Sequence, residues 1–257
     1  MDWDAAYNNA DFIPGAQDYI ARWTREAEAF RAAWPRAELN VAYGDHPREA
    51  FDLFLPEGAA QGLVVFVHGG YWLRFDRSFW SHFAKGPLLR GWAVALPSYP
   101  LCPEVGLPQI TASVTRAVEA AATRVAGPLR LAGHSAGGHL VARMASVLPP
   151  DLCARLARVV PISPVSDLRP LMQTAMRETL HLDDAVCAAE SPVLHPRPDL
   201  PVTIWVGAEE RPVFLDQARW LAEAWEAGHR VAPGRHHFDV IDGLRDPDSP
   251  LTNALLG

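Results

Sequence analysis

Two continuous apolar runs, GLVVFV (62–67) and WAVALP (92–97), lie in the first half of this chain. Runs of this kind are typical of strands that are buried on both faces of a parallel sheet. PLRLAG (128–133), ARVVPIS (157–163) and PVTIWVG (201–207) are further expected strands, and segments with helical spacing of apolar residues separate each strand from the next. The alternation of strand and helix therefore predicts an α/β fold, with a mostly parallel central sheet and helices on both faces.

The segments around these runs supply the helices and the remaining strands. ELNVAYG (38–44) and REAFDLFLP (48–56) alternate apolar and polar residues, which predicts two half-buried strands joined by the turn GDHP. HRVAP (229–233) adds a short last strand, so we expect about eight strands in all. Helices are expected over 16–33, 77–90, 107–125, 136–147, 213–228 and 248–256, with a helical but irregular stretch over 168–190.

Length and composition favour a single domain. The 257 residues are 49% hydrophobic and 21% charged, and α/β folds of this size commonly form one unit. No internal repeat or low-complexity segment interrupts the pattern. We therefore expect residues 1–257 to form one domain, in which residues 1–35 are a helical extension before the first strand.

Charge and hydropathy limit the partners of the protein. A formal net charge of −7 leaves no basic face for a phosphate backbone, so we expect no nucleic-acid partner. No uninterrupted apolar run is longer than Leu63–Val67, which is far below the ~20 residues of a membrane span. The N-terminus is acidic and lacks the pattern of a signal peptide. Cys102, Cys153 and Cys187 are widely spaced, which indicates reduced thiols and predicts a cytoplasmic location without membrane partners.

The stretch LRLAGHSAGGHL (129–140) carries the first sign of chemistry. Residues 133–137 form a G-x-S-x-G pattern centred on Ser135, between an expected strand and an expected helix. In that context the serine occupies a strained strand-to-helix turn, and its side chain projects beyond the carboxyl edge of the sheet. Ser135 is therefore a candidate nucleophile, and the bulky His134 beside it is a candidate substrate contact. The alternative is a glycine-rich turn with a capping serine.

A serine hydroxyl needs a base, and the base needs an acid that orients it. In this arrangement the acid follows the strand before the last, and the histidine follows the last strand. The strand PVTIWVG is followed by Glu209 and Glu210, and the G-x-x-acid spacing favours Glu210. Asp216 and Asp239 are weaker alternatives, because one is expected on a helix and the other lies beyond the histidine.

Two histidines follow the last strand, His236 and His237. We favour His237 as the base, because the apolar Phe238 beside it can anchor the loop. A histidine pair can also bind a metal ion, but no HExxH motif or set of carboxylates accompanies it, so we expect no metal site.

A third motif, His68-Gly69-Gly70-Tyr71-Trp72, comes directly after the strand GLVVFV. The two glycines allow backbone N–H groups to turn toward a substrate oxygen. Gly69 and Gly70 are therefore candidates for an oxyanion hole, together with the N–H of Ala136 after the nucleophile. Tyr71 and Trp72 are candidate substrate contacts.

HGGYW together with GHSAGGHL resembles the α/β-hydrolase superfamily, specifically the branch with kynurenine formamidase (arylformamidase) and small bacterial esterases. YPLCPE (99–104), DLRPL (167–171), VGAEERPVF (206–214) and HFD (237–239) are similar to further segments of that branch. The resemblance implies Ser135 as nucleophile, His237 as base and Glu210 as acid. This chain departs from the branch in having Glu210 where aspartate is usual and Arg211 where serine is usual.

The resemblance implies a serine hydrolase that cleaves a small amide or ester through an acyl-enzyme and needs no cofactor. The expected reaction converts N-formylkynurenine to kynurenine and formate. General short-chain carboxylesterase or thioesterase activity is the alternative, and a non-catalytic binding protein on the same fold is a further one. The expected partner is the small-molecule substrate, and a homodimer is possible.

Side chains near the two motifs suggest how a substrate is held. Phe75 and Trp80 could form an aromatic wall with Tyr71 and Trp72, although the same residues could serve only to pack the loop. A substrate carboxylate would need a cation, for which the nearby candidates in sequence are Arg74, Arg77 and Arg211. The aromatic residues of 1–35 suggest the hypothesis that this extension covers the mouth of the active site.

Overall fold

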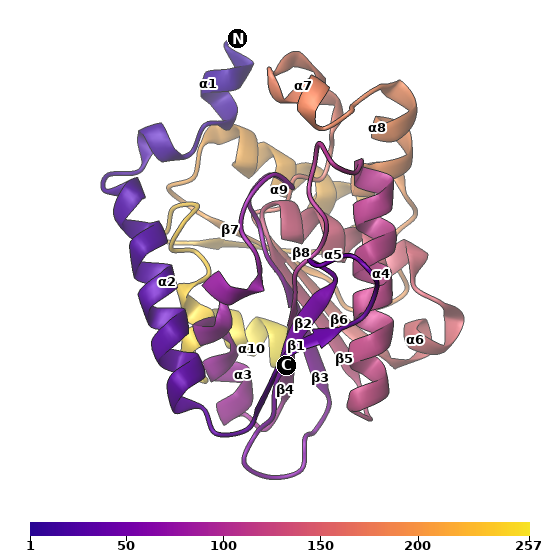
Figure 1. Ribbon diagram of the computed structural model, residues 1–257. Helices are drawn as coiled ribbons and strands as arrows, with labels where there is room; N and C mark the ends of the chain where they lie inside the picture. Colours follow the sequence, from indigo (N-terminus) through magenta and orange to yellow (C-terminus); the bar gives the residue numbers. More distant parts are fainter.

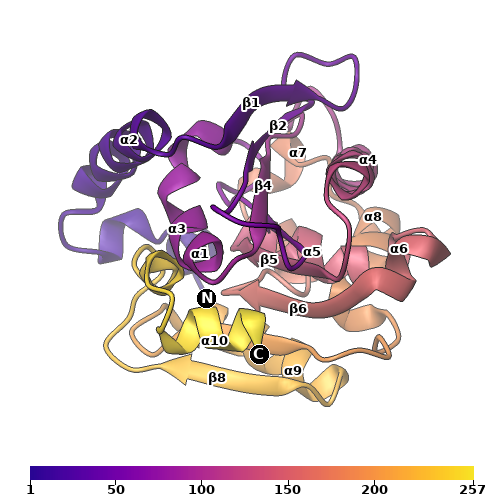
Figure 2. The ribbon, with the colours of Figure 1, turned by 90° about the horizontal axis from the view of Figure 1, so that it is seen from below.

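A twisted sheet of eight strands runs through the protein in the computed structural model, which describes residues 1–257 (Figures 1 and 2). The strand order is β1-β2-β4-β3-β5-β6-β7-β8, and the pairs β1–β2 and β2–β4 are antiparallel while all others are parallel. The bounds are β1 Ala37–Ala42, β2 Ala50–Phe54, β3 Leu63–Val67, β4 Ala93–Pro97, β5 Leu129–His134, β6 Leu156–Ile162, β7 Thr203–Gly207 and β8 Gly228–Ala232. The predicted mostly parallel sheet with about eight strands is confirmed.

Ten α-helices connect and flank these strands. They are α1 Trp3–Tyr7, α2 Ala16–Ala33, α3 Lys85–Leu89, α4 Leu107–Arg124, α5 Ala136–Val147, α6 Pro150–Arg155, α7 Met176–Thr179, α8 Asp184–Glu190, α9 Pro212–Ala224 and α10 Pro250–Leu256. Short 3-10 turns lie among them, including Arg77–Phe79, Ser81–Ala84 and Arg169–Gln173. No helix is both long enough and apolar enough to span a bilayer.

Helices cover both faces of the sheet. Successive side chains of a strand point to opposite faces, so a strand with both faces buried contributes to two apolar clusters. In β3, Leu63, Val65 and Val67 belong to one apolar cluster, whereas Val64 and Phe66 belong to another. The first cluster is completed by α4, α5 and α9, and the second by α2, α3 and α10. Figure 2 shows α3 and α5 on opposite sides of β4.

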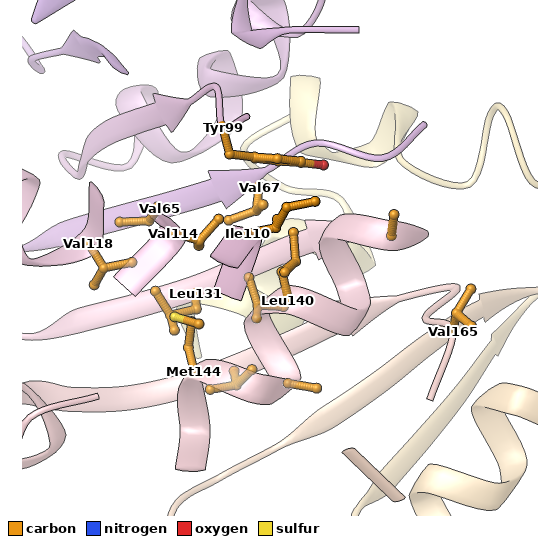
Figure 3. Close-up of a cluster of buried hydrophobic side chains, with 14 of the residues drawn as sticks. Val65, Val67, Tyr99, Ile110, Val114, Val118, Leu131, Leu140, Met144 and Val165 are labelled. Atoms are coloured by element: carbon orange, nitrogen blue, oxygen red, sulfur yellow. The ribbon is translucent and has the colours of Figure 1, made fainter. Parts of the chain in front are cut away.

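The larger cluster lies where α4 and α5 pack on β3 and β5 (Figure 3). The side chains of Ile110, Val114 and Val118 recur at helical spacing on α4 and meet Val65 and Leu131 of the strands. All five are fully buried or nearly so. Burying a side chain of this size contributes about 1.5–3 kcal/mol. Leu140 and Met144 of α5 belong to the same cluster, which fixes α5 against the strand that precedes it and so fixes the turn that joins them.

One predicted helix is wrong. The expected helix over 77–90 is a 3-10 turn Arg77–Phe79, a second turn Ser81–Ala84 and the short α3. Trp80 has φ −120° and ψ 0°, which interrupts the helical backbone. The break allows Trp80 to turn inward, where it is almost fully buried.

Candidate active site

Ser135 lies at the sharp turn between β5 and α5. Its backbone has φ 56° and ψ −116°, a combination that a residue with a side chain adopts only under strain. The Ser135 N–H donates to the carbonyl of Ile162 on β6 (2.8 Å), and its own carbonyl accepts from the His139 N–H (3.0 Å). These two hydrogen bonds hold the strained turn in place at the carboxyl edge of the sheet.

The small residues around Ser135 are required by close backbone contacts. A Cβ added to Gly133 would lie 2.2 Å from the carbonyl oxygen of Gly137, and one added to Gly137 would lie 2.0 Å from that of Val67. Both distances are far below van der Waals contact. Only glycine therefore allows α5 to start so close to β3 and β5.

His237 and Glu210 form a buried hydrogen-bonded pair. The Nδ1–H of His237 donates to Oε2 of Glu210 at 2.6 Å. Glu210 Oε1 also accepts from the Gly207 N–H (2.9 Å) and from the hydroxyl of Ser163. Because Nδ1 carries the proton in this pair, the lone pair of the neutral imidazole is on Nε2, as a base requires.

The structure separates Glu210 from the alternative acids. Glu209 is exposed to solvent. Asp216 pairs with Arg219 on the surface of α9, and Asp239 accepts from the backbone N–H of His236. His236 in turn contacts the Tyr19 hydroxyl (3.0 Å). Among these residues, Glu210 is the acid that contacts His237.

A cavity of about 790 Å³ connects the two motifs. Ser135, His134 and His237 line it, together with Gly70 and Tyr71 of the HGGYW loop. Aromatic side chains form much of its apolar wall, namely Tyr7, Trp23, Tyr71, Phe75, Trp80 and Phe238. The cavity is large enough for a small aromatic molecule, and the serine and histidine face the same space.

Three backbone N–H groups beside Ser135 have no hydrogen-bond acceptor within the protein, those of Gly69, Gly70 and Ala136. Gly70 has φ +113°, which favours glycine. The Nδ1–H of His68 donates to the Gly69 carbonyl (2.7 Å), and that carbonyl shares a peptide plane with the Gly70 N–H. Since the two groups of one peptide point in opposite directions, this bond holds the Gly70 N–H away from His68.

His134 lines the cavity but is almost completely buried. Its Nε2–H donates to the backbone carbonyl of His237 (2.8 Å), and the two rings lie 4.7 Å apart. Burial lowers the pKa of His134 well below its usual value, so the ring is neutral at physiological pH. His134, expected to contact substrate, therefore holds the loop that carries His237.

The two aromatic residues of HGGYW differ in position. Tyr71 lines the cavity, and its hydroxyl donates to the carbonyl of Tyr7 on α1 (2.6 Å). Trp72 has no exposed surface and does not line the cavity. Its indole packs edge-on against His139 of α5 (5.0 Å between ring centres). The expectation that Trp72 contacts substrate is thus wrong, because the left-handed backbone at Tyr71 and Trp72 turns the indole into the core.

The three arginines that are candidates for binding a substrate carboxylate differ in their contacts and in whether they line the cavity. Arg77 donates from Nε to Asp52 (2.9 Å). Arg211 donates to the Ala6 carbonyl (3.1 Å) and lies over the ring of Phe12 (3.3 Å). Arg74 lines the cavity.

The N-terminal extension forms one wall of the cavity. Residues of α1, α2 and the segment between them line it, namely Asp4, Tyr7, Asn8, Asn9, Ala10, Asp11, Ala16, Gln17, Ile20 and Trp23. The Asp4 carboxylate accepts from the Ala175 N–H (2.7 Å), which joins α1 to the segment before α7. Figure 1 shows α1 and α7 at the same end of the molecule.

Two contributors to the site were not expected from the sequence. Ser163, which donates to Glu210, directly follows β6 and has φ 47°. Its place after a parallel strand was a usable signal, because the carboxyl ends of parallel strands meet at one edge. Asn9 is buried and lines the cavity, but no local pattern marks it, since its position depends on how the N-terminal segment folds back.

Comparison with known proteins agrees with the observed fold. A family profile described as the α/β hydrolase fold matches residues 64–233. A protein of Drosophila melanogaster named kynurenine formamidase is 31% identical over 243 residues, which cover 84% of this chain and 79% of that protein. A provisionally named thioesterase from Silicibacter sp. TM1040 has a crystal structure with 56% identity and a TM-score of 0.98, covering 100% of both chains.

A more distant structure extends the likeness of fold. The esterase of Pyrobaculum calidifontis is 18% identical, with a TM-score of 0.69 and coverage of 89% of this chain and 90% of that one. The family profile spans more than half of the chain, and the Drosophila relative exceeds 30% identity over most of its length. This chain therefore belongs to the α/β hydrolase family.

Proposed function

We propose that this protein is a serine hydrolase with Ser135 as nucleophile, His237 as general base and Glu210 as the acid that orients it. One observation carries the proposal: Ser135 occupies a strained turn in a cavity that His237 also lines, and His237 is bonded to a buried carboxylate. A structural serine at a helix start gives no reason for such a pair beside it.

The reaction proceeds in two halves. His237 Nε2 takes the proton of Ser135 as Oγ attacks the carbonyl carbon, and the same proton then passes to the leaving amine or alkoxide, which departs. The acyl group remains on Ser135 Oγ. Water then loses a proton to His237 Nε2 and attacks the acyl carbon, and the proton returns to Oγ as the acid leaves.

The N–H groups of Gly69, Gly70 and Ala136 stabilise the oxyanion formed in each half. All three are without an internal acceptor, so their hydrogen bonds are available to a substrate oxygen. Ala136 is also the first residue of α5, whose N-terminal dipole favours negative charge. Loss of one such donor typically costs about 3 kcal/mol of transition-state stabilisation.

We propose an aryl formamide as substrate, with N-formylkynurenine cleaved to kynurenine and formate. The aromatic wall of the cavity suits an aromatic leaving group. Two relatives that are 31% and 29% identical to this chain carry the name kynurenine formamidase. A thioester is the second candidate, favoured by the provisional name of the 56% identical protein from Silicibacter.

A comparison of kcat/KM for N-formylkynurenine, p-nitrophenyl acetate and an acyl thioester tests the assignment. Formamidase function predicts that the formyl substrate is preferred by about tenfold or more. A smaller preference, or a preference for the thioester, would replace it with general esterase or thioesterase function while leaving the serine mechanism in place.

A further inference from the structure

The donors of the proposed oxyanion hole come from two separate segments. Gly69 and Gly70 belong to the HGGYW loop after β3, and Ala136 begins α5. The two segments are in close contact, since a Cβ added to Gly69 would lie 2.8 Å from the His134 carbonyl oxygen and 3.1 Å from Cβ of Ser135. The three N–H groups can converge on one oxygen only if the loop is held at a fixed place relative to α5.

His139 of α5 contacts both segments. Its backbone N–H donates to the Ser135 carbonyl (3.0 Å) in the first turn of the helix. Its ring packs edge-on against the indole of Trp72, the last residue of HGGYW, with 5.0 Å between ring centres. Both side chains are fully buried, and neither lines the cavity. His139 therefore joins the loop to α5 without reaching a substrate.

The loop needs such a support because its backbone is strained. Gly70, Tyr71 and Trp72 have φ values of 113°, 54° and 58° in succession, and residues with a side chain keep this left-handed conformation only where their surroundings enforce it. The Trp72 carbonyl accepts from the Cys102 N–H (2.9 Å), whereas the indole N–H has no hydrogen-bond partner. The side chain of Trp72 is therefore fixed by packing, in which His139 is its aromatic neighbour.

The ring of His139 is held in turn by α8. Its Nε2–H donates to the backbone carbonyl of Glu190 (2.6 Å), the last residue of that helix. The Glu190 carboxylate accepts from Thr111 Oγ1 of α4 (2.7 Å) and from Arg143 Nε of α5 (3.1 Å). All four of these residues are buried. The carbonyl that orients His139 is thus fixed by two further helices.

Filling the core does not account for a histidine at this position. Burial of an imidazole costs free energy, and here its Nδ1 atom has no hydrogen-bond partner. Burial also lowers the pKa of His139 to about 3, so the ring is neutral and has no charge to place in an ion pair. Leucine or phenylalanine would fill the space without these costs but would not form the bond to Glu190. That bond fixes the direction of the ring against which Trp72 packs.

We propose that His139 is a positioning residue, which holds Trp72 and through it places the two loop N–H groups opposite that of Ala136. The inference rests on the proposed hydrolase function of the Ser135 site and names the support of its oxyanion hole. His139 touches neither the substrate nor the reacting atoms. Its loss should weaken transition-state stabilisation, and therefore kcat, more than substrate binding.

The test compares p-nitrophenyl acetate with its thionoester analogue, in which sulfur replaces the carbonyl oxygen. Sulfur accepts hydrogen bonds less well than oxygen, so an intact oxyanion hole favours the oxygen ester. For His139→Leu we expect the ratio of the two kcat/KM values, oxygen ester to thionoester, to fall by about tenfold or more, with KM for the oxygen ester nearly unchanged. A variant that only lowers the amount of folded enzyme reduces both rates equally and leaves the ratio as it was.

Two further variants separate positioning from stability. His139→Gln keeps an N–H group that can reach the Glu190 carbonyl, and it should recover part of the ratio. Leu255→Ala removes buried contacts on α10, away from the cavity, so it should destabilise the protein and leave the ratio within about twofold of the wild-type value. An unchanged ratio in His139→Leu, or an equal fall in Leu255→Ala, would overturn the proposal.

Failure of this inference is distinct from failure of the proposed function. If the wild-type protein hydrolyses the oxygen ester and Ser135→Ala does not, the serine mechanism stands whatever the ratio in His139→Leu. If the wild type cleaves formamides but not esters, the same ratio is measured with 2′-formamidoacetophenone and its thioformamide. Absence of hydrolysis by the wild type with all of these substrates would overturn both proposals.

Discussion

At the scale of single residues, the acid at the site is the main departure from the branch that this chain resembles. Glu210 has one more methylene than aspartate, yet its carboxylate is held by three donors, from Gly207, Ser163 and His237. These bonds fix both oxygens, so the longer side chain still presents a rigid acceptor to His237. The loop after β7 and the end of β6 together determine its position.

Glu210→Ala should lower kcat by about 10³-fold or more, since His237 then loses the partner that fixes its tautomer. Glu209→Ala is the matched control, because its side chain is exposed one residue earlier, and kcat should stay near the wild-type value. Steady-state measurement of kcat for both variants on one substrate shows which glutamate supports His237. The reverse ranking of the two variants would show that the acid has been misassigned.

Gly137→Ala should destabilise the protein and reduce activity together. Its Cβ would lie 2.0 Å from the Val67 carbonyl oxygen, so α5 must shift away from β3, and overpacking of this kind costs about 1–3 kcal/mol or more. Gly58→Ala, where nothing lies within 4 Å of the added Cβ, should change neither property. Urea unfolding of both variants gives the comparison, and equal midpoints would argue against a tightly packed turn.

At the scale of elements, the strands and long helices follow from local patterns. β3 and β4 are apolar throughout because both of their faces are buried, and α4 shows helical spacing because one face meets the sheet. The predictions for 77–90 and for Trp72 were wrong for a shared reason. In both segments the backbone departs from regular structure to place a tryptophan in the core, and that choice is made by tertiary packing.

Three residues of the candidate site could be predicted from the sequence, but the N-terminal wall of its cavity could not. Ser135, Glu210 and His237 follow strands in a fixed order, so the topology brings their loops together. The N-terminal wall depends on contacts between residues far apart in sequence, such as the bond from Tyr71 to Tyr7. Such contacts leave no periodic mark in the sequence.

Removal of residues 1–15 should raise KM for an aromatic substrate, because that segment supplies α1 and much of the cavity wall. Tyr71→Phe is a milder variant that removes only the hydrogen bond to the Tyr7 carbonyl, and its KM should rise less. Both are measured beside p-nitrophenyl acetate, which is too small to reach the whole wall. An unchanged KM in the truncated protein would mean that the segment is only packing.

At the scale of the whole molecule, several histidines are buried in neutral form. Burial lowers the pKa of His68 to about 4 and that of His139 to about 3. Burial, with the nearby charges of Arg245, Arg22 and Arg31, lowers the pKa of His82 to about 3. The unfolded chain takes up these protons near pH 6.5, whereas the folded chain does so only near pH 3–4.

The free energy of unfolding should therefore fall as the pH is lowered from 7 to 5, by about 2 kcal/mol for each such histidine. His82→Phe removes one of these groups, and both of its ring nitrogens lack hydrogen-bond partners, so the fall should be smaller by about that amount. His181→Gln, at an exposed position, is the control. Urea unfolding at the two pH values makes the measurement, and identical slopes in wild type and His82→Phe would contradict the prediction.

We propose that the fold holds Ser135 as an activated nucleophile at the carboxyl edge of the sheet. This proposal is tested by treating the intact protein with a fluorophosphonate probe and locating the adduct by mass spectrometry of its peptides. We expect a single adduct on Ser135 that is lost in Ser135→Ala and slowed in Glu210→Ala. Failure of the folded protein to form an adduct, or an adduct on a serine outside the cavity, would rule out Ser135 as the nucleophile.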